Sequence, residues 1–326
     1  MLINVVGIIL GLALLTKGAD LFVDGASGLA TKLGIPPLVV GLTIVALGTS
    51  APEAAISIAA ATQAAGSITI ANVLGSNIVN TLVILGVVAL VAKVPVRQTT
   101  LRVDIPLVMA ATILLLGLCL HDGALGRLDA LLLLALLVGY LFYLVKTAQK
   151  AEPHAEKNDR VDDDAFNKDA AVPEASKRAT STPWQVGLSI LGAAIICFGA
   201  DLTVDNALVL AEAWGIPQRV VGLTVIALGT SLPELVTSIT AARKGQTDIA
   251  LGNVVGSSIL NLLFVLGLSG VLSPIPFSSE LLFDGVVALA AIALVWVLCA
   301  RNKALGRVGG ASLLASYATY VGYLLA

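Results

Sequence analysis

The chain alternates between long apolar runs and short polar segments. The apolar runs cover residues 2–29, 36–61, 68–92, 103–120, 125–145, 184–210, 217–242, 249–271, 281–300 and 308–325. Most of them come near the roughly 20 residues that a helix needs to cross a bilayer. We therefore predict an all-α polytopic membrane protein with about ten transmembrane helices.

One long polar stretch interrupts this pattern in the middle of the chain. It covers residues 148–182 and is rich in acidic and basic side chains, with three consecutive aspartates at positions 162–164. Such a stretch cannot bury enough apolar surface to fold, so we predict an acidic, solvated linker. It separates two units of five runs each, at residues 1–147 and 183–326.

The composition agrees with lipid as the solvent of this chain. Hydrophobic residues make up 57% and charged residues only 12% of the sequence, against roughly 25% charged residues in a soluble domain. No basic patch suggests a nucleic acid. The three cysteines and two histidines have no metal-ligand spacing, so we expect no resident cofactor.

Lysine and arginine are distributed unevenly between the two sides that alternate along the predicted spans. One side holds eleven of them and the other holds two, Arg127 and Arg219. The eleven are Lys32, Lys93, Arg97, Arg102, Lys146, Lys150, Arg243, Lys244, Arg301, Lys303 and Arg307. Cytoplasmic loops are enriched in lysine and arginine. We therefore place both termini outside the inner membrane and the 148–182 linker in the cytoplasm.

The two units are related by an internal repeat. The segments GLTIVALGTSAPEAAISIAAA, from Gly41, and GLTVIALGTSLPELVTSITAA, from Gly222, share 14 of 21 residues at an offset of 181. The same offset relates Asn72 to Asn253 and Asn80 to Asn261. Because each unit has an odd number of spans, the second enters the membrane from the opposite side. The fold is therefore two inverted five-helix repeats, which in transporters place the substrate near the midplane.

Both repeats contain the motif GTS-x-P-E inside the second span of the unit. Pro52 and Pro233 lack an N–H and clash with the carbonyl four residues back, at Gly48 and Gly229. We therefore expect helices 2 and 7 to be broken there. Unpaired backbone at membrane depth is tolerated only around an enclosed or water-filled cavity.

A glutamate follows each predicted break, at Glu53 and Glu234. Threonines and serines share its helix face, and asparagines and serines line the next span at a spacing of four. Two-fold symmetry would bring both sets to one centre. These ligands are all oxygen, which suits Ca²⁺ and disfavours Zn²⁺ and Cu⁺. Mg²⁺ is disfavoured because it demands nearly octahedral geometry.

The two buried acids give a physical basis for exchange. Each acid at the membrane centre costs about 3 kcal/mol on insertion scales. One Ca²⁺, two monovalent cations or two protons would cancel the pair of charges equally well. An empty, fully ionised site is unfavourable, and if it also resists the transition between access states, transport becomes obligatory exchange.

These motifs resemble those of the calcium/cation antiporter superfamily, in particular the bacterial sodium/calcium exchanger type of inner-membrane antiporter. The resemblance rests on GTSAPE at 48–53, GTSLPE at 229–234, NVLGSN at 72–77 and GNVVGSS at 252–258, and it spans the whole chain. It implies ten helices with spans 2, 3, 7 and 8 around the ions. It also implies alternating access by sliding of spans 1 and 6.

The resemblance further implies a role for each site residue. Ca²⁺ would be bound by Glu53, Glu234, Thr49 and Thr230. Na⁺ sites would use Ser50, Ser76, Ser231, Ser257 and the carbonyls of Ala46 and Ala227. Asn80 and Asn261 would complete the central position. Asn261 stands where some relatives have aspartate, which argues against potassium dependence.

We interpret the chain as a Na⁺/Ca²⁺ antiporter for which a monomer suffices in principle. Relatives coupled to protons usually carry a different motif around the glutamate, which favours Na⁺. An H⁺-coupled or other divalent-cation exchanger is the nearest alternative, and a passive channel is a more distant one. An enzyme is disfavoured because no nucleophile–base pair is evident. Asp20, Asp24, Asp201 and Asp205 are interpreted as interfacial or structural residues.

Overall fold

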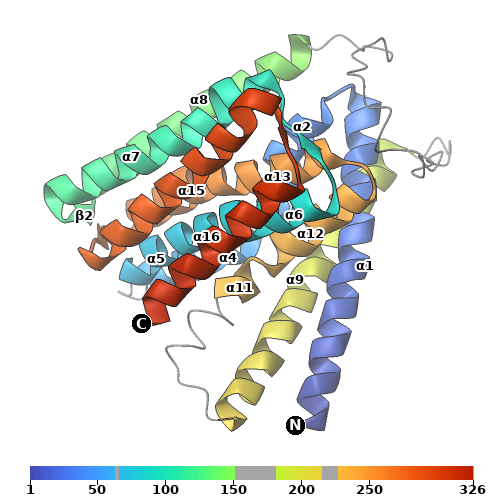
Figure 1. The fold of residues 1–326 in the computed structure, drawn as a ribbon, viewed down its shortest axis with the longest axis horizontal. Coiled ribbons are helices and arrows are strands. Elements are labelled where there is room, and N and C mark those ends of the chain that lie inside the picture. Colours follow the sequence, from blue (N-terminus) through green and yellow to red (C-terminus); the bar gives the residue numbers. More distant parts are fainter. Residues whose placement is uncertain (63–65, 151–180, 215–226, 326) are drawn as a thin grey trace.

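The computed structural model describes residues 1–62, 66–150, 181–214 and 227–325, which form a bundle of helices (Figure 1). Segments marked η are π-helical. The first half contains α1 (Leu2–Leu33), α2 (Pro37–Val40), η1 (Gly41–Val45), α3 (Ala46–Thr49), α4 (Ala51–Thr62), α5 (Gly66–Ile78), η2 (Val79–Ile84), α6 (Leu85–Val91), β1 (Val94–Pro95), η3 (Thr100–Asp104), α7 (Ile105–Asp122), β2 (Ala124–Leu125) and α8 (Arg127–Lys150). The second half contains α9 (Thr182–Ala213), α11 (Ala227–Thr230), α12 (Leu232–Arg243), α13 (Thr247–Leu260), η5 (Asn261–Val265), α14 (Leu266–Leu272), β3 (Ile275–Pro276), α15 (Glu280–Asn302), β4 (Ala304–Leu305) and α16 (Arg307–Leu325).

The helices confirm a multi-pass membrane protein. Within the described residues, seven helices are long and apolar enough to cross a membrane, and the bent pair at 37–49 and 51–61 makes an eighth. The expected span at 217–242 begins outside the described residues. Most of the predicted linker also lies outside them. The expected span at 308–325 is the helix α16, which is not one of the seven. The count of ten therefore stays a prediction.

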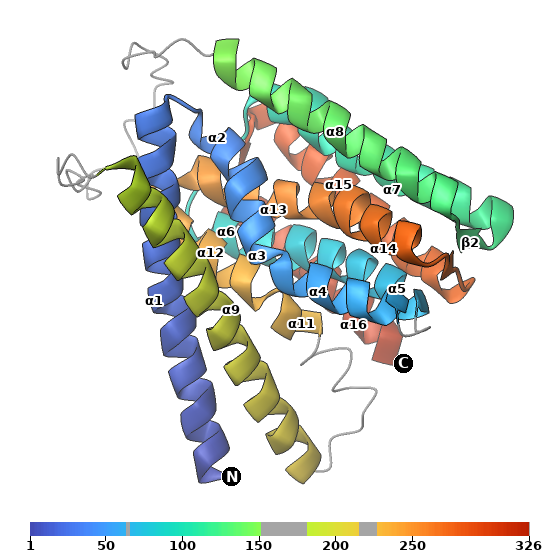
Figure 2. The same ribbon diagram turned by 180° about the vertical axis from the view of Figure 1, so that it is seen from behind.

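Two long helices, α1 and α9, lie side by side and extend beyond the block formed by the other helices (Figures 1 and 2). Their backbones approach closely at glycines. A Cβ added at Gly192 would lie 2.5 Å from the backbone nitrogen of Phe22, and one at Gly199 would lie 2.8 Å from that of Leu15. Small residues allow such close packing between membrane helices. The pair therefore forms one unit that packs against the rest of the bundle.

Both predicted breaks are present within the described residues, and each falls on the serine of the motif. The helix α3 ends at Thr49, Ser50 has ψ 7°, and α4 continues at an angle of 51°. Ser231, with ψ 6°, likewise separates α11 from α12. Pro52 and Pro233 then occupy the second position of the new helix, where a missing N–H costs nothing. The prolines thus start a helix rather than kink one.

Four strands of two residues each were not expected from the apolar pattern. Val94 of β1 pairs with Leu305 of β4, and Leu125 of β2 pairs with Ile275 of β3, both antiparallel. The repeat offset of 181 maps β1 onto β3, and an offset of 180 maps β2 onto β4. A two-fold axis that exchanges the repeats therefore exchanges the two pairs. This register is independent support for the inverted repeat.

The π-helical segments obey the same symmetry. Asn80 is the second residue of η2, and Asn261 is the first residue of η5. Each segment continues an α-helix, α5 or α13, without a break in the chain. Single π-turns inside α-helices occur frequently at functional sites. Here they shift the helix register at the two asparagines that the sequence places at the centre of the site.

Candidate functional site

The breaks position the two glutamates. Glu53 and Glu234 lie in the first turn of α4 and α12, where the positive end of the helix dipole favours a carboxylate. Their side chains are 1% and 0% exposed. The side chain of Ser50, three residues before Glu53, contacts the carboxylate of Glu234. The predicted pair of buried acids is therefore brought together in the structure.

A hydroxyl from the first repeat contacts the acid of the second. Ser50 Oγ donates a hydrogen bond of 2.9 Å to Glu234 Oε1. Ser257 Oγ, on α13, donates to the same oxygen at 3.5 Å. Because Ser50 is the break residue of the first repeat, the two interrupted spans meet at Glu234. The site is thus shared between the repeats.

A second connection between the repeats runs through Asn253. Thr49 Oγ1 donates to Asn253 Oδ1 at 2.9 Å, and Asn253 Nδ2 donates to Ser238 Oγ at 2.9 Å and to the Glu234 carbonyl at 3.4 Å. All four of these side chains are buried. Asn253 therefore connects the end of α3 to the helix that carries Glu234.

The first repeat has a counterpart of this arrangement. Asn72 Nδ2 donates to Ser57 Oγ at 3.1 Å, which corresponds to the bond between Asn253 and Ser238. Near the next asparagines the repeats touch again. Asn261 Nδ2 donates to Asn77 Oδ1 at 3.3 Å, and Asn77 Nδ2 donates to the Ser258 carbonyl at 3.2 Å.

Several buried polar atoms of the site have no hydrogen-bond partner among the described residues. They are both carboxylate oxygens of Glu53, Oε2 of Glu234, the hydroxyls of Ser231 and Thr237, both side-chain polar atoms of Asn80, and Oδ1 of Asn261. An unpaired buried polar group costs about 1–3 kcal/mol, and a charged group costs more. Nearly all of these atoms are oxygens, which hard cations prefer as ligands. The donor set therefore fits a cation such as Ca²⁺ or Na⁺.

The structure buries nearly all side chains that the sequence assigned to the site. Those buried are Glu53, Glu234, Thr49, Thr230, Ser50, Ser231, Ser76, Ser257, Asn80, Asn261 and Ala46. The Ala46 carbonyl accepts a hydrogen bond of 2.9 Å from the Ser50 N–H and one of 3.4 Å from Thr49 Oγ1. Ala227 begins α11, and its side chain lies outside the described set. Whether each residue binds an ion stays a prediction.

Sequence reasoning missed two further pairs of polar side chains inside the membrane helices. Tyr140 Oη donates to Asp104 Oδ1 at 2.9 Å, and Tyr320 Oη donates to Asp284 Oδ1 at 2.8 Å. Both pairs join the fourth and fifth spans of a repeat. An aspartate within an apolar run was the available signal, since such residues are rare and paired.

Comparisons with known proteins agree with this architecture. Residues 3–146 and 184–326 match the family model described as Sodium/calcium exchanger protein. The chain is 37% identical to the putative antiporter CaxA of Alkalimonas amylolytica, over 100% of this chain and 99% of that protein. It is 34% identical to the sodium/calcium exchanger MaX1 of Methanosarcina acetivorans, over 90% of each chain.

The fold also matches solved structures. The sodium-calcium exchanger NCX_Mj superposes with a TM-score of 0.80 at 29% identity, covering 99% of this chain and 98% of that chain. Among relatives compared by sequence, the inner membrane protein YrbG of Escherichia coli is 39% identical over 84% of this chain and 81% of its own length. Each match extends into both repeats.

Proposed function

We propose, from the premise that this chain belongs to the sodium/calcium exchanger family, that it exchanges Ca²⁺ for Na⁺ at a site centred on Glu53 and Glu234. Family membership supports cation antiport as the general activity. The identity of the coupling ion, the alternating-access cycle and the role of the two glutamates are the finer parts of the proposal.

One observation carries the proposal. Two acids from symmetry-related breaks lie buried near each other, with three of their four carboxylate oxygens unpaired among the described residues. Removing two negative charges from water is costly unless positive charge compensates them. A bound cation supplies that compensation, and the unpaired oxygens are its ligands.

Calcium fits the proposed centre. It takes six to eight oxygen ligands in flexible geometry. The carboxylates of Glu53 and Glu234 would supply the charge, and the hydroxyls of Thr49 and Thr230 would add neutral oxygens. Asn80 and Asn261 would complete the set, and their side-chain oxygens are buried without a partner among the described residues. The hydrogen bond from Ser50 to Glu234 still leaves lone pairs on the Ser50 hydroxyl for a cation.

Sodium would use more of the neutral oxygens. The hydroxyls of Ser50, Ser76, Ser231 and Ser257 would contribute, with the carbonyls of Ala46 and Ala227. The Ala46 carbonyl already accepts hydrogen bonds, so it would offer only a remaining lone pair. Two Na⁺ cancel the same charge as one Ca²⁺, and the two loads therefore compete for one site.

The arrangement of helices supports alternating access. The pair α1 and α9 packs through glycines into one unit that extends beyond the other helices (Figure 2). Sliding of this unit against the rest would open the site to either side in turn. The inverted symmetry makes the two open states nearly equivalent in structure.

Transport by reconstituted protein tests the proposal. Purified protein in vesicles loaded with Na⁺ is expected to take up external Ca²⁺, and vesicles loaded with K⁺ at the same pH are expected to take up far less. Uptake driven by an acidic interior without Na⁺ would replace Na⁺ by H⁺ as the coupling ion. Ca²⁺ flux without any counter-ion would indicate a channel and overturn the proposal.

A further inference from the structure

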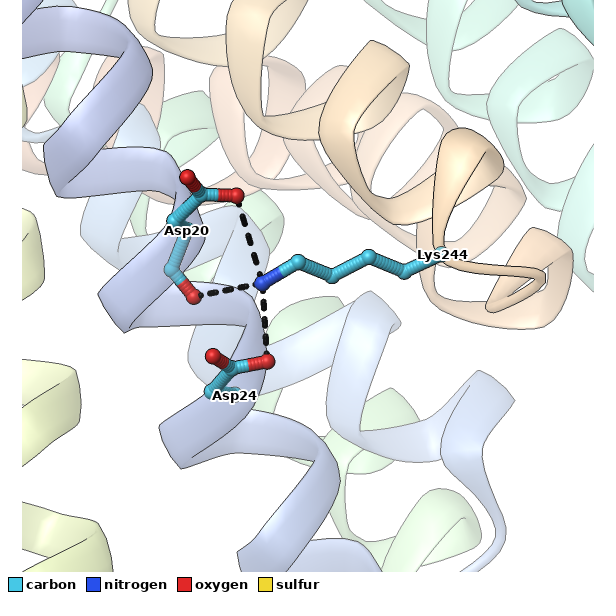
Figure 3. A network of polar contacts seen from close by, with 3 residues as sticks. All are labelled: Asp20, Asp24 and Lys244. Carbon is cyan, nitrogen blue, oxygen red and sulfur yellow. Dashed lines mark hydrogen bonds and ion pairs between the residues drawn. The ribbon is translucent and has the colours of Figure 1, made fainter. Parts of the chain in front are cut away.

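Lys244 connects α1, one of the two long helices, to the rest of the molecule. Its ammonium nitrogen lies 2.8 Å from Asp24 Oδ1, 3.3 Å from Asp20 Oδ1 and 3.0 Å from the Asp20 carbonyl oxygen (Figure 3). Asp20 and Asp24 are one turn apart on α1. Lys244 thus reaches across to a helix 220 positions earlier in the chain and binds three of its oxygens.

The position of Lys244 ties this contact to the proposed site. Lys244 is the C-cap residue that directly follows α12, and Glu234 lies in the first turn of the same helix. The contact therefore joins α1, which belongs to the unit proposed to slide, to the helix that holds one of the two acids. Any sliding of α1 along α12 has to break it.

The repeat symmetry does not extend to Lys244 in the sequence. At the offset of 181, Asp20 and Asp24 correspond to Asp201 and Asp205 of α9, whereas Lys244 corresponds to Gln63. A glutamine has no charge with which to pair an aspartate. The sequence of the first repeat therefore has no cation at the position that corresponds to Lys244.

We propose that Lys244, Asp20 and Asp24 form a latch on one side of the membrane that biases the exchanger toward the access state closed on that side. The proposal rests on the alternating-access function above. By the distribution of lysine and arginine the latched side is the cytoplasmic one, so the favoured state opens outward. The latch makes a nearly symmetric transporter unequal in its two directions.

The strength of the latch is set by its partial exposure. The side chains of Lys244, Asp20 and Asp24 are 29%, 40% and 61% exposed, so water weakens the attraction without abolishing it. Exposed ion pairs of this kind change an equilibrium by about two- to five-fold. A bias of that size shifts the two open states without locking either.

Distances within the molecule test the latch without any transport assay. Spin labels at Thr31→Cys on α1 and Arg301→Cys on α15, with Cys119, Cys197 and Cys299 replaced by alanine, report the position of α1. Lys244→Gln introduces the residue that the first repeat has at the corresponding position. It is expected to shift the equilibrium between the two label distances, in favour of the second one, by about two- to five-fold. Arg243→Gln removes a neighbouring exposed charge and is expected to leave the distribution unchanged.

A charge exchange separates pairing from other effects of Lys244. The double variant Asp24→Lys with Lys244→Asp again places one cation between two acids, and it is expected to restore the original distance distribution. Lys244→Gln with an unchanged distribution would overturn the latch. So would a change of the same size in Arg243→Gln.

Sidedness of ion binding gives the second test. In vesicles of known orientation, Lys244→Gln is expected to weaken the apparent Ca²⁺ affinity on the outer face and to strengthen it on the cytoplasmic face, so that the ratio of the two affinities changes by about two- to five-fold. Equal weakening on both faces would overturn the latch, because it would place Lys244 in support of the site itself. Absence of exchange by the unaltered protein would instead contradict the proposed function, and the distances would still decide the latch.

Discussion

At the residue scale, the two glutamates are equivalent by sequence but not by environment. Glu234 accepts hydrogen bonds from Ser50 and Ser257, whereas both oxygens of Glu53 have no partner among the described residues. Hydroxyl groups already stabilise one carboxylate oxygen of Glu234, so Glu53 depends more on the bound cation. The site is symmetric in chain trace and asymmetric in its hydrogen bonds.

This asymmetry leads to a prediction for the neutral variants. Glu53→Gln and Glu234→Gln are both expected to reduce Na⁺-dependent Ca²⁺ uptake by about 100-fold or more, which corresponds to about 2.7 kcal/mol. Without ions, Glu53→Gln is expected to unfold at a higher temperature than the unaltered protein, since it removes an unpaired buried charge. Vesicle uptake measures the first effect, and thermal unfolding in detergent without ions measures the second.

The control for these variants is Glu280→Gln, which neutralises an exposed acid at the first turn of α15. It is expected to keep normal uptake and normal stabilisation by Ca²⁺. Uptake near the normal level in either site variant would contradict the assignment of the acids.

A second prediction concerns the hydroxyl of Thr49. Thr49→Val removes the donor to Asn253 Oδ1 and leaves that oxygen unpaired, so it is expected to lower the free energy of unfolding by about 1–3 kcal/mol. Thr16→Val, at an exposed site of α1 whose hydroxyl bonds only to Leu12 of its own helix, serves as the control. Equal stability of the two variants would show that the contact with Asn253 contributes nothing.

At the element scale, the contact between α1 and α9 depends on the absence of side chains. Gly192→Ala would place a Cβ 2.5 Å from the backbone nitrogen of Phe22, and backbone cannot rotate away. The expected loss is about 1–3 kcal/mol of unfolding free energy, typical of overpacking, together with slower exchange. Thermal unfolding and initial uptake rates measure the two effects.

Another glycine of α9 supplies the matched control. A Cβ added at Gly187 would meet nothing within 4 Å. Gly187→Ala is therefore expected to be neutral or slightly stabilising, because alanine favours helix more than glycine. If both alanine variants behaved alike, close packing would not be the role of Gly192.

The elements show where sequence reasoning succeeded and where it stopped. The breaks and the burial of Glu53 and Glu234 could be predicted because a proline and a glutamate occur at the same position inside an apolar span of both repeats. The partner of Lys244 and the bonds of Asn253 did not follow. They depend on how distant helices meet, and the apolar periodicity that predicts a helix contains no information on its neighbours.

At the scale of the whole molecule, the repeats complete each other. The Ser50–Glu234 and Thr49–Asn253 bonds and both strand pairs join one repeat to the other. Neither repeat contains a finished site. The domain boundary near 148–182 is nevertheless expected to be the place where the chain tolerates division.

This expectation is testable with divided chains. Two fragments separated within 148–182 and produced together are expected to assemble and exchange Ca²⁺, and each fragment alone is expected to be inactive. A division between α7 and α8, inside the first repeat, is the control and is expected to give much lower activity. Co-purification and vesicle uptake measure the outcome. Equal activity of the two divided forms would contradict the predicted boundary.

The crossed strand pairs have a consequence for biosynthesis. Val94 waits for Leu305, which lies 211 positions later, and at about 5–20 residues per second the ribosome needs on the order of 10–40 s to supply it. During that interval the first repeat lies in the bilayer without its partner. The charge of Glu53 is then not compensated by the complete site, and the strands β1 and β2 are unpaired. The insertion machinery therefore has to protect the first repeat from aggregation until translation is nearly complete.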